Sequence, residues 1–465
     1  GDVYLTQRQS LMLRTNYTDG NTDTTAIGNT VGSRVLIHNQ TQSAAAHHSY
    51  LTPTKVNELR LGYTRQTEDD SFLDPPLLGN PAVNGEVGFL IVPGLSPGGF
   101  LGFLGRKNFQ NNYQVSDDLT LRAGAHAWKF GSSLRRVQVN GGAETSGFRG
   151  QLFFPTVGEF LAGRPLSYTR NIGNPFLGLR RWEWHTYVQD DWQIRPNLML
   201  NLGLRYELNT APTEQYGRLP AQVPGDHNNF APRVGLAWSV REGTVVRSGY
   251  GIYYNALEMA FLGLTRFNPP LFRSISAFRP QLPNLAGRAA DALPSGLVVP
   301  DANTRSPYAQ HYNLTIEQEV GRMSSFSVAY VGTSGVKLPR TRRPNGGENL
   351  AQAARPDPTV GVVNRLETSA ASNYHGLQAS YNLRGGRSMN LRLAYTYTRY
   401  IDDVSEFANT NQRLDRNIVP IAEDNLRLDR AVSDFHIPHM FTAAWSWQAP
   451  WAASRWFGGW TLSGI

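Results

Sequence analysis

The chain lacks cysteine, has little lysine and contains no long hydrophobic run. With no cysteine among 465 residues, disulfide scaffolds and thiolate metal sites are excluded. No segment approaches the roughly 20 consecutive apolar residues of a membrane-spanning helix, so a helical membrane protein is excluded as well. The hydrophobic fraction of 40% points to a soluble protein. That indication is unsafe, because a strand with one polar face hides its membrane signal from averages of this kind.

Arginine supplies nearly all of the positive charge. Lys55, Lys107, Lys129 and Lys337 are the only lysines, which leaves 40 arginines among the 44 basic residues and a net charge of +8. Two explanations remain open. Guanidinium groups could attract anionic solutes or lipid phosphates, or a GC-rich genome could favour arginine codons. The arginines are spread along the chain, so nucleic acid is not an expected partner.

The clearest pattern is strict alternation of apolar and polar residues. From Asn197 to Leu208, one parity holds Leu198, Leu200, Leu202, Leu204, Tyr206 and Leu208. The other parity is mostly polar. Successive side chains of a strand point to opposite faces, so this segment predicts a strand with one apolar and one wet face.

About fifteen such segments follow one another. The predicted strands are 3–17, 32–48, 55–66, 111–122, 126–139, 181–194, 197–209, 232–240, 243–255, 307–320, 323–333, 372–384, 387–400, 436–448 and 457–465. Seven gaps between them are short and seven are long, in strict alternation. The long ones after the first are 67–109, 140–180, 210–231, 256–305, 334–370 and 401–434. Within 140–180, the stretch 156–165 predicts a short helix or strand of its own.

Two classes of connection indicate a particular architecture. Tight turns on one rim and large loops on the other are typical of an antiparallel, up-and-down transmembrane β-barrel. Apolar stripes ending in Tyr and Trp, such as Met389, Leu391, Leu393, Tyr395 and Tyr397, suit a lipid-facing surface with aromatic girdles. The alternatives are a β-sandwich and a β-propeller, but every predicted strand keeps a polar opposite face and no blade-length repeat occurs.

The predicted barrel is incomplete. Fifteen strands is an odd number, whereas bacterial single-chain barrels have even numbers, and the last strand has no closing partner after Ile465. Free sheet edges cannot lie in hydrocarbon. We therefore expect residues 1–465 to form one partial barrel domain, with more strands after Ile465 and a further segment before Gly1.

Several phrases of the chain resemble a known family, the TonB-dependent outer-membrane receptors and specifically their Oar-like members. The phrases occur in the order of that family over about two-thirds of the chain. They include TVGEFLAGRP (156–165), HTYVQDDWQIRPNLMLNLGLRYE (185–207), NNFAPRVGLAW (228–238), VVRSGYGIYYN (245–255), SPYAQHYNLTIEQEV (306–320), SVAYVGTSGVKL (327–338), SNYHGLQASYNLR (372–384), AYTYTRYIDD (394–403), LRLDRAVSDFHIPHMF (426–441) and GGWTLSGI (458–465).

This resemblance implies a 22-stranded barrel of the bacterial outer membrane, closed inside by an N-terminal plug. It also implies energisation by the TonB complex through a short box near the N-terminus. Neither the plug nor the box is in this sequence. Members of the family carry iron chelates, cobalamin, glycans, peptides or proteins, so the expected ligand is an unknown small molecule, glycan or peptide.

Few residues suggest site chemistry. His47 and His48 are adjacent on a predicted strand, so their imidazoles diverge and cannot chelate one ion together. Asp190 and Asp191 diverge for the same reason, which favours capping or salt-bridge roles. Loop 401–434 is the most charged stretch, and we expect an ion-pair lattice there, with calcium binding as the alternative. Its charged residues are Asp402, Asp403, Glu406, Asp415, Glu423, Asp424, Asp429, Asp434, Arg413, Arg416, Arg427 and Arg430.

The sequence predicts a transporter and not an enzyme. It contains no GxSxG, Walker, HExxH or cysteine-nucleophile motif, and no catalytic, cofactor or metal residue is predicted. We expect loops 67–109, 140–180, 256–305 and 401–434 and upward-facing lumen groups to capture the ligand. A passive porin or a surface adhesin on the same barrel remains an alternative, as does a secreted soluble β-protein.

Overall fold

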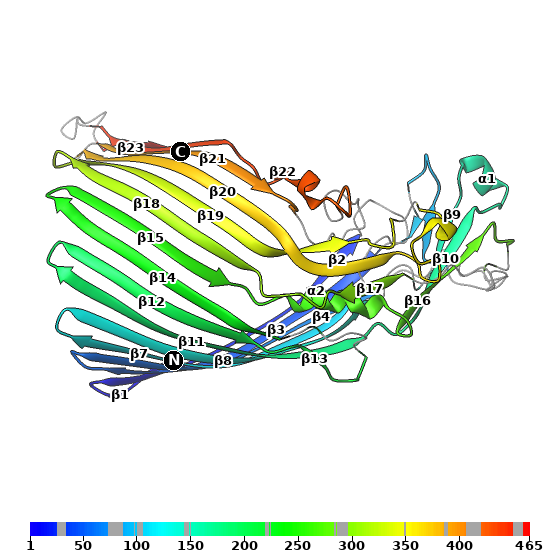
Figure 1. The fold of residues 1–465 in the computed structure, drawn as a ribbon, viewed down its shortest axis with the longest axis horizontal. Coiled ribbons are helices and arrows are strands. Elements are labelled where there is room, and N and C mark those ends of the chain that lie inside the picture. Colours follow the sequence, from blue (N-terminus) through cyan, green and yellow to red (C-terminus); the bar gives the residue numbers. More distant parts are fainter. Residues whose placement is uncertain are drawn as a thin grey trace.

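The computed structural model covers the whole chain and describes most of it. The described residues are 1–465 except 26–33, 73–86, 97, 100–105, 144–147, 149, 219–222, 224, 283–284, 286–295, 348–349, 386–388, 406–419 and 450–458. One large sheet of 19 strands forms a curved wall (Figure 1).

Sixteen strands of the sheet pair antiparallel with their neighbours in chain order. They are β1 (Asp2–Thr6), β2 (Gln9–Thr25), β3 (Arg34–Leu51), β4 (Lys55–Phe72), β7 (Arg106–Ala123), β8 (His126–Ala143), β11 (Leu177–Arg195), β12 (Leu198–Asn209), β14 (Asp226–Arg241), β15 (Thr244–Tyr254), β18 (Tyr308–Val320), β19 (Ser324–Arg342), β20 (Val363–Gly385), β21 (Met389–Asp402), β23 (His439–Gln448) and β24 (Thr461–Gly464). The short strands β13 (Thr213–Glu214), β17 (Leu297–Pro300) and β22 (Ala431–Val432) complete the sheet.

The wall is all-β and open. Within the described ranges, β1 pairs only with β2 and β24 only with β23, so no ladder joins the two ends of the sheet. The prediction of an incomplete antiparallel barrel is confirmed. The total of 22 strands and the segments before Gly1 and after Ile465 stay predictions.

The first predicted strand, 3–17, is two strands. β1 and β2 meet at Gln7-Arg8, where the Arg8 amide donates to Thr6 Oγ1 at 3.2 Å. No glycine or proline marks this turn, which hides it in the sequence. The wall therefore has one strand more than expected. The extra connection is a short one, so the alternation of short and long connections continues.

Short turns gather on one rim, at the left of Figure 1. Gly124, between β7 and β8, has φ +60°, and Gly321, between β18 and β19, has φ +65°. Both values lie in the left-handed region that tight hairpins need and glycine reaches freely. Several strands run further toward the other rim than the alternation predicts, because the ladders continue beyond the apolar stripes. β20, predicted as 372–384, begins at Val363.

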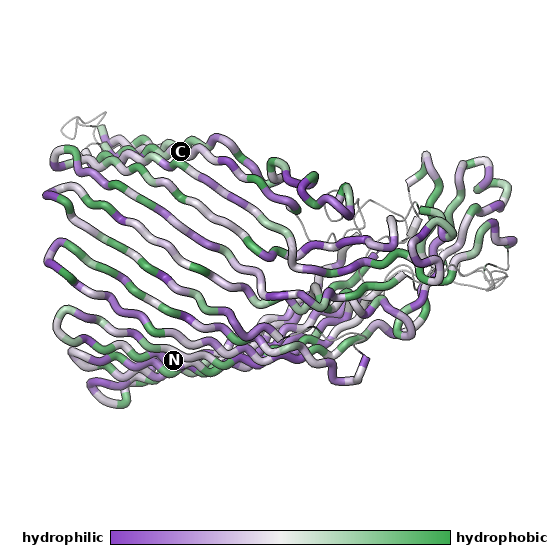
Figure 2. The backbone as a smooth tube through the Cα atoms, viewed as in Figure 1, coloured by the Kyte–Doolittle hydropathy of each residue, from purple (hydrophilic) through white to green (hydrophobic). Residues whose placement is uncertain are grey.

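Hydropathy alternates along the wall strands (Figure 2). On β12 the outward Leu202 and Leu204 are 42% and 45% exposed, a wide apolar surface that fits contact with lipid. Their strand neighbours Asn201 and Arg205 face inward and bond acidic side chains. The predicted division into an apolar outer face and a polar inner face is thus present.

The long loops build a second sheet beyond the far rim, at the right of Figure 1. It contains β5 (Phe89–Ile91), β6 (Gly98–Gly99), β9 (Gln151–Phe153), β10 (Ser167–Gly173) and β16 (Phe272–Phe278). Its core includes Val87, Leu152, Phe154 and Tyr168. The sequence did not predict this sheet, since its strands are short and find partners in other loops.

Helices are few and short. The expected element in 156–165 is α1 (Val157–Leu161), whose first turn is capped by Thr156 Oγ1 accepting from the Glu159 amide at 3.1 Å. The other helical segments are α2 (Met259–Gly263), η2 (Leu264–Phe267), η4 (Gln352–Ala354) and η5 (Leu426–Asp429). None of the helices in the described part of the chain has the length and apolarity to cross a membrane.

Candidate ligand-binding site at the mouth and inner wall

The inner wall carries a network of paired charges. Arg60 on β4 bonds Asp118 on β7 and Glu58 on its own strand, each at 2.6 Å. The Tyr187 hydroxyl, from β11, donates to the other oxygen of Asp118 at 2.8 Å. These side chains border a hollow of about 350 Å³ that Arg135, His185 and Arg205 also line. The inner arginines here act as partners of acids on neighbouring strands.

Glu183 is the most deeply buried acid of this wall. Its side chain is fully buried, and Arg181 Nη2 bonds its Oε1 at 2.6 Å. Arg135 Nε, from β8, donates to its Oε2 at 2.6 Å. Two guanidinium groups therefore share one carboxylate, which satisfies a charge that would otherwise be costly to bury.

Some polar atoms of the inner wall are buried without a well-formed hydrogen bond among the described residues. The side chains of His185 and Asn209 interact with one another, yet His185 Nε2 and both polar atoms of the Asn209 amide make no hydrogen bond of normal geometry there. On β11 and β12, His185 and Asn209 occupy the same alternate positions as Glu183 and Glu207, so their side chains also point inward. Because an unpaired buried donor or acceptor costs about 1–3 kcal/mol, these positions suit an additional group supplied from inside the barrel.

A segment of the longest loop crosses the mouth of the wall. It contains α2, η2, β16 and β17, and we call the described residues 257–282, 285 and 296–300 the mouth segment. β17 pairs in parallel with β20, while Arg181 of β11 donates a hydrogen bond to the Leu257 carbonyl. Leu177 and Leu179 of β11 and Leu366 of β20 belong to one apolar cluster with Leu257, Met259 and Leu262.

This arrangement ties together distant parts of the wall. β11 and β20 are separated by β12, β14, β15, β18 and β19, and the mouth segment leaves the wall between β15 and β18. Asn268 fixes its fold: the side-chain amide donates to the Val298 carbonyl at 2.7 Å and accepts from the Val298 amide at 2.6 Å. The segment therefore narrows the entrance as a fixed structure.

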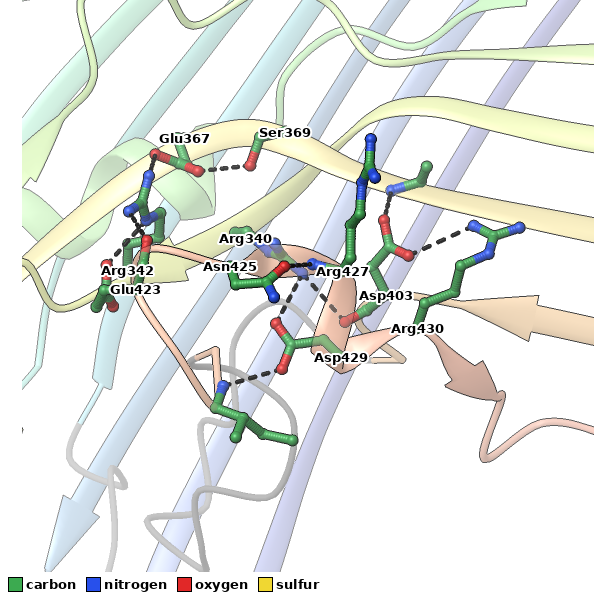
Figure 3. A network of polar contacts seen from close by, with 12 residues as sticks. Arg340, Arg342, Glu367, Ser369, Asp403, Glu423, Asn425, Arg427, Asp429 and Arg430 are labelled. Atoms are coloured by element: carbon green, nitrogen blue, oxygen red, sulfur yellow. Dashed lines mark hydrogen bonds and ion pairs between the residues drawn. The ribbon is translucent and has the colours of Figure 1, made fainter.

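Loop 401–434 forms an ion-pair lattice in its described part (Figure 3). Arg342 Nε bonds Glu423 at 2.9 Å, Arg340 Nη2 lies 3.5 Å from Asp429, and Arg430 lies 3.5 Å from Asp403. The expected lattice is thus present. Glu406, Arg413, Asp415 and Arg416 lie outside the described residues.

The main cations of this lattice come from outside the loop. Arg340 and Arg342 belong to β19, and the side chain of Arg340 is 1% exposed. The charge pattern of the sequence indicates only the arginines inside the loop, so neither residue was predicted. The signal was the basic phrase Arg340-Thr-Arg-Arg343 at the end of a strand, but only the fold shows that this phrase lies beside 423–429.

The adjacent pairs singled out in the sequence diverge as predicted. His47 faces inward, and its Nε2 lies 3.3 Å from Glu58 Oε1. His48 faces outward, opposite Leu11 and Leu59 on the two neighbouring strands. Asp191 faces inward and bonds Lys129 at 2.7 Å, and Asp190 faces outward and bonds His126 at 2.7 Å. Asp191 therefore forms a salt bridge, and Asp190 forms a hydrogen bond with a histidine. Among the described residues, no group of three or more His, Asp or Glu side chains could hold a metal ion.

An open antiparallel wall with a lipid-compatible outer face, a charged inner face and loops folded over one rim defines an outer-membrane β-barrel protein. The family model described as "Outer membrane beta barrel domain" matches residues 1–224 and 219–465. The chain belongs to this family and lies in the bacterial outer membrane. A comparison with curated proteins found no match.

Solved structures of outer-membrane transporters and receptors share the fold. The outer-membrane transporter YddB from Escherichia coli has a TM-score of 0.61 at 12% identity, over 96% of this chain and 53% of that one. The alcaligin receptor FauA from Bordetella pertussis has 0.53 at 10%, over 97% and 56%. The ferripyoverdine receptor of Pseudomonas aeruginosa has 0.55 at 12%, over 97% and 52%. The chain therefore spans little more than half the length of these structures.

Proposed function

We propose that this chain is the barrel part of a TonB-dependent outer-membrane transporter. Its long loops capture a scarce or bulky ligand, and the barrel passes the ligand inward with energy from the TonB complex. The observation that carries the proposal is the inner wall, where His185 and Asn209 bury polar atoms that form no hydrogen bond of normal geometry among the described residues.

A plug explains these atoms. A wall of this many strands encloses more space than its own side chains can fill, so selectivity requires a further body inside. Backbone and side-chain groups of a plug would supply the donors and acceptors that His185 and Asn209 lack. The 350 Å³ hollow beside Arg60 and Asp118 is a second polar surface that the plug could contact.

The proposed ligand is a small molecule, a glycan or a peptide. Among the similar structures, one is an alcaligin receptor, one is a receptor bound to ferripyoverdine, and one is a complex of FpvAI with pyocin S2. In this chain, capture falls to the second sheet, the mouth segment and the lattice of loop 401–434, because these form the rim opposite the short turns.

A passive pore is the second candidate. The mouth segment favours it in one respect, since a fixed segment across the entrance can set a size limit without any plug. A porin predicts an inner wall that is open to small solutes at all times, whereas a plugged transporter predicts a covered one.

Two measurements separate these functions. Because the chain has no cysteine, His185→Cys introduces a unique thiol into it. In the full-length gene product in whole cells, we expect this thiol to react with a membrane-impermeant maleimide far more slowly than a thiol at Leu161→Cys, which is 79% exposed on α1. We also expect no steady KCl conductance in planar bilayers. Equal labelling rates together with steady conductance would establish the porin instead.

A further inference from the structure

Asp190 of β11 is an acidic side chain on the outer face of the wall. On β11 the outward parity carries Trp182, Trp184 and Trp192, which are 44%, 44% and 36% exposed. Asp190 has this same parity, whereas the next residue, Asp191, faces the lumen. Asp191 is fully engaged there by Lys129, Gln189 and Asn201. Asp190 is therefore a carboxylate on the membrane side of the wall.

Asp190 is only half satisfied. Its Oδ2 bonds His126 Nδ1 at 2.7 Å. Its Oδ1 is buried and has no partner among the described residues, and the side chain as a whole is 8% exposed. Polar groups at a lipid-facing surface are costly when unpaired and are rare there without a function. This oxygen thus calls for a donor from outside the protein.

A groove on the outer wall begins at this carboxylate. It has a volume of about 460 Å³ and runs across β8, β11, β12, β14 and β15. Besides Asp190, Arg233 borders the groove, and its guanidinium carbon lies 4.2 Å from the centroid of the Tyr253 ring. The other lining groups are mostly apolar or aromatic, among them Trp128, Val188, Leu202, Leu204, Val234 and Tyr250. An acyl chain fits such a surface, since burial of each CH₂ group contributes about 0.8 kcal/mol.

The carboxylate lies close to the short-turn rim. Asp190 precedes the end of β11 at Arg195, and His126 is the first residue of β8 after the Gly124 turn. The His126 ring stacks between Trp128 and Trp192, with centroids 5.9 and 5.3 Å away. Aromatic rings at this place mark the membrane interface, and short turns of outer-membrane barrels lie on the periplasmic side. Asp190 is thus at the headgroup level of the periplasmic leaflet.

We propose that Asp190 and this groove bind a phospholipid of the periplasmic leaflet whose headgroup ends in a primary ammonium group. The ammonium carries three N–H donors, and its charge complements the Asp190 carboxylate. An acyl chain of the same lipid fills the groove along Leu202, Leu204 and Val234. A quaternary ammonium has no N–H donor, and a glycerol headgroup has no cation, so both bind less well. The proposal requires the membrane location but not the transport function.

Native mass spectrometry tests this proposal. The full-length gene product is released from vesicles that contain equal parts of phosphatidylethanolamine, phosphatidylglycerol and phosphatidylcholine with matched acyl chains. We expect retained phosphatidylethanolamine on the wild type and at least a tenfold loss in Asp190→Asn. Asp191→Asn is the matched control, because it removes an equal charge from the adjacent residue on the lumen side, and it should retain the lipid. Equal retention in Asp190→Asn and wild type would overturn the site.

A second pair of variants keeps the test decisive if Asp190→Asn folds poorly. Leu204→Trp fills the groove with an apolar ring and should also lose the phosphatidylethanolamine. Leu200→Trp makes the same change on the same outward face of β12, outside the groove, and should keep it. Retention that is the same in both tryptophan variants, or phosphatidylcholine retained as well as phosphatidylethanolamine, would contradict the proposal.

Discussion

Arg181 joins the wall to the mouth segment, since one guanidinium binds Glu183 within β11 and donates to the Leu257 carbonyl across the entrance. Glu183→Gln removes the buried charge that Arg181 and Arg135 share. Because breaking a buried ion pair leaves an uncompensated charge, we expect the free energy of unfolding to fall by about 3–5 kcal/mol. The temperature at which the folded band disappears in heat-modifiability gels measures this.

Glu242→Gln is the control for that change. Glu242 lies in the exposed turn between β14 and β15, where loss of a charge should leave the transition temperature unchanged. If both variants melt alike, the buried pair does not stabilise the wall.

Gly131 makes room for the Tyr187 ring on the inner face. A β-carbon at Gly131 would overlap Tyr187 Cε1 and Asp118 Oδ1, so Gly131→Ala forces the ring away from its bond to Asp118. We expect a destabilisation of about 1–3 kcal/mol, typical of overpacking. Gly62→Ala is a matched control on the same face, where the new β-carbon would be 4.0 Å from Gln114 Cβ. Urea unfolding in detergent micelles compares them, and equal midpoints would refute the steric argument.

The two faces of β18 should respond differently to charge. Leu314 is 47% exposed on the outer face, and Leu314→Arg places a guanidinium in lipid at a cost of about 2–4 kcal/mol near the midplane. Asn313→Arg, one residue away, faces the lumen and should cost little. Folding yield into lipid vesicles is the measurement. A loss with Asn313→Arg and none with Leu314→Arg would reverse the assignment of the faces.

The wall could be predicted from the sequence because its information is local. The alternation in 197–209 gives both the strand and its outward face, and β12 spans Leu198–Asn209. Short turns marked by Gly124 or Arg195-Pro196 fix the hairpins. The Gln7-Arg8 turn was not predicted, because neither residue is a typical turn-forming residue. The full lengths of β19 and β20 were not predicted, because the parts of these strands near the long-loop rim lack an apolar stripe.

The mouth and the second sheet could not be predicted in this way. β9 has three residues, and its partners β5 and β10 are reached through long loops. The ion-pair lattice was predicted from composition, yet Arg340 as its buried cation depends on contact between β19 and residues 423–429. Such pairings depend on tertiary structure and leave no periodic signal. The alternation of residues along β11 indicates the outward orientation of Asp190. The unpaired oxygen of Asp190 and the groove beside it appear only in the three-dimensional structure.

The α1 helix should lose stability in acid. Arg164 bonds both oxygens of Glu159, at 2.8 and 3.0 Å, and these bonds hold the pKa of Glu159 below its usual value of 4.5. A lowered folded-state pKa stabilises the fold above the unfolded pKa, and the gain is lost as the pH falls through the folded pKa. We expect faster hydrogen exchange of the α1 amides near pH 3 than the intrinsic pH dependence explains. Glu159→Gln should abolish this excess, and an excess that persists in the variant would exclude the ion pair as its cause.

Asn268 holds the mouth segment in its observed fold. Its side chain is the partner of both backbone polar groups of Val298, and the residue is 4% exposed. Asn268→Leu keeps the approximate size but leaves these groups without their partner, which costs about 1–3 kcal/mol each when they are buried. We expect trypsin added to intact cells to cleave faster within the mouth segment, at Arg266 or Arg273, as mapped by peptide mass. Asn303→Leu replaces an exposed amide further along the same loop and should cleave at the wild-type rate. Cleavage that stays slow in Asn268→Leu would mean that the apolar contacts with Leu177, Leu179 and Leu366 hold the segment in place without this side chain.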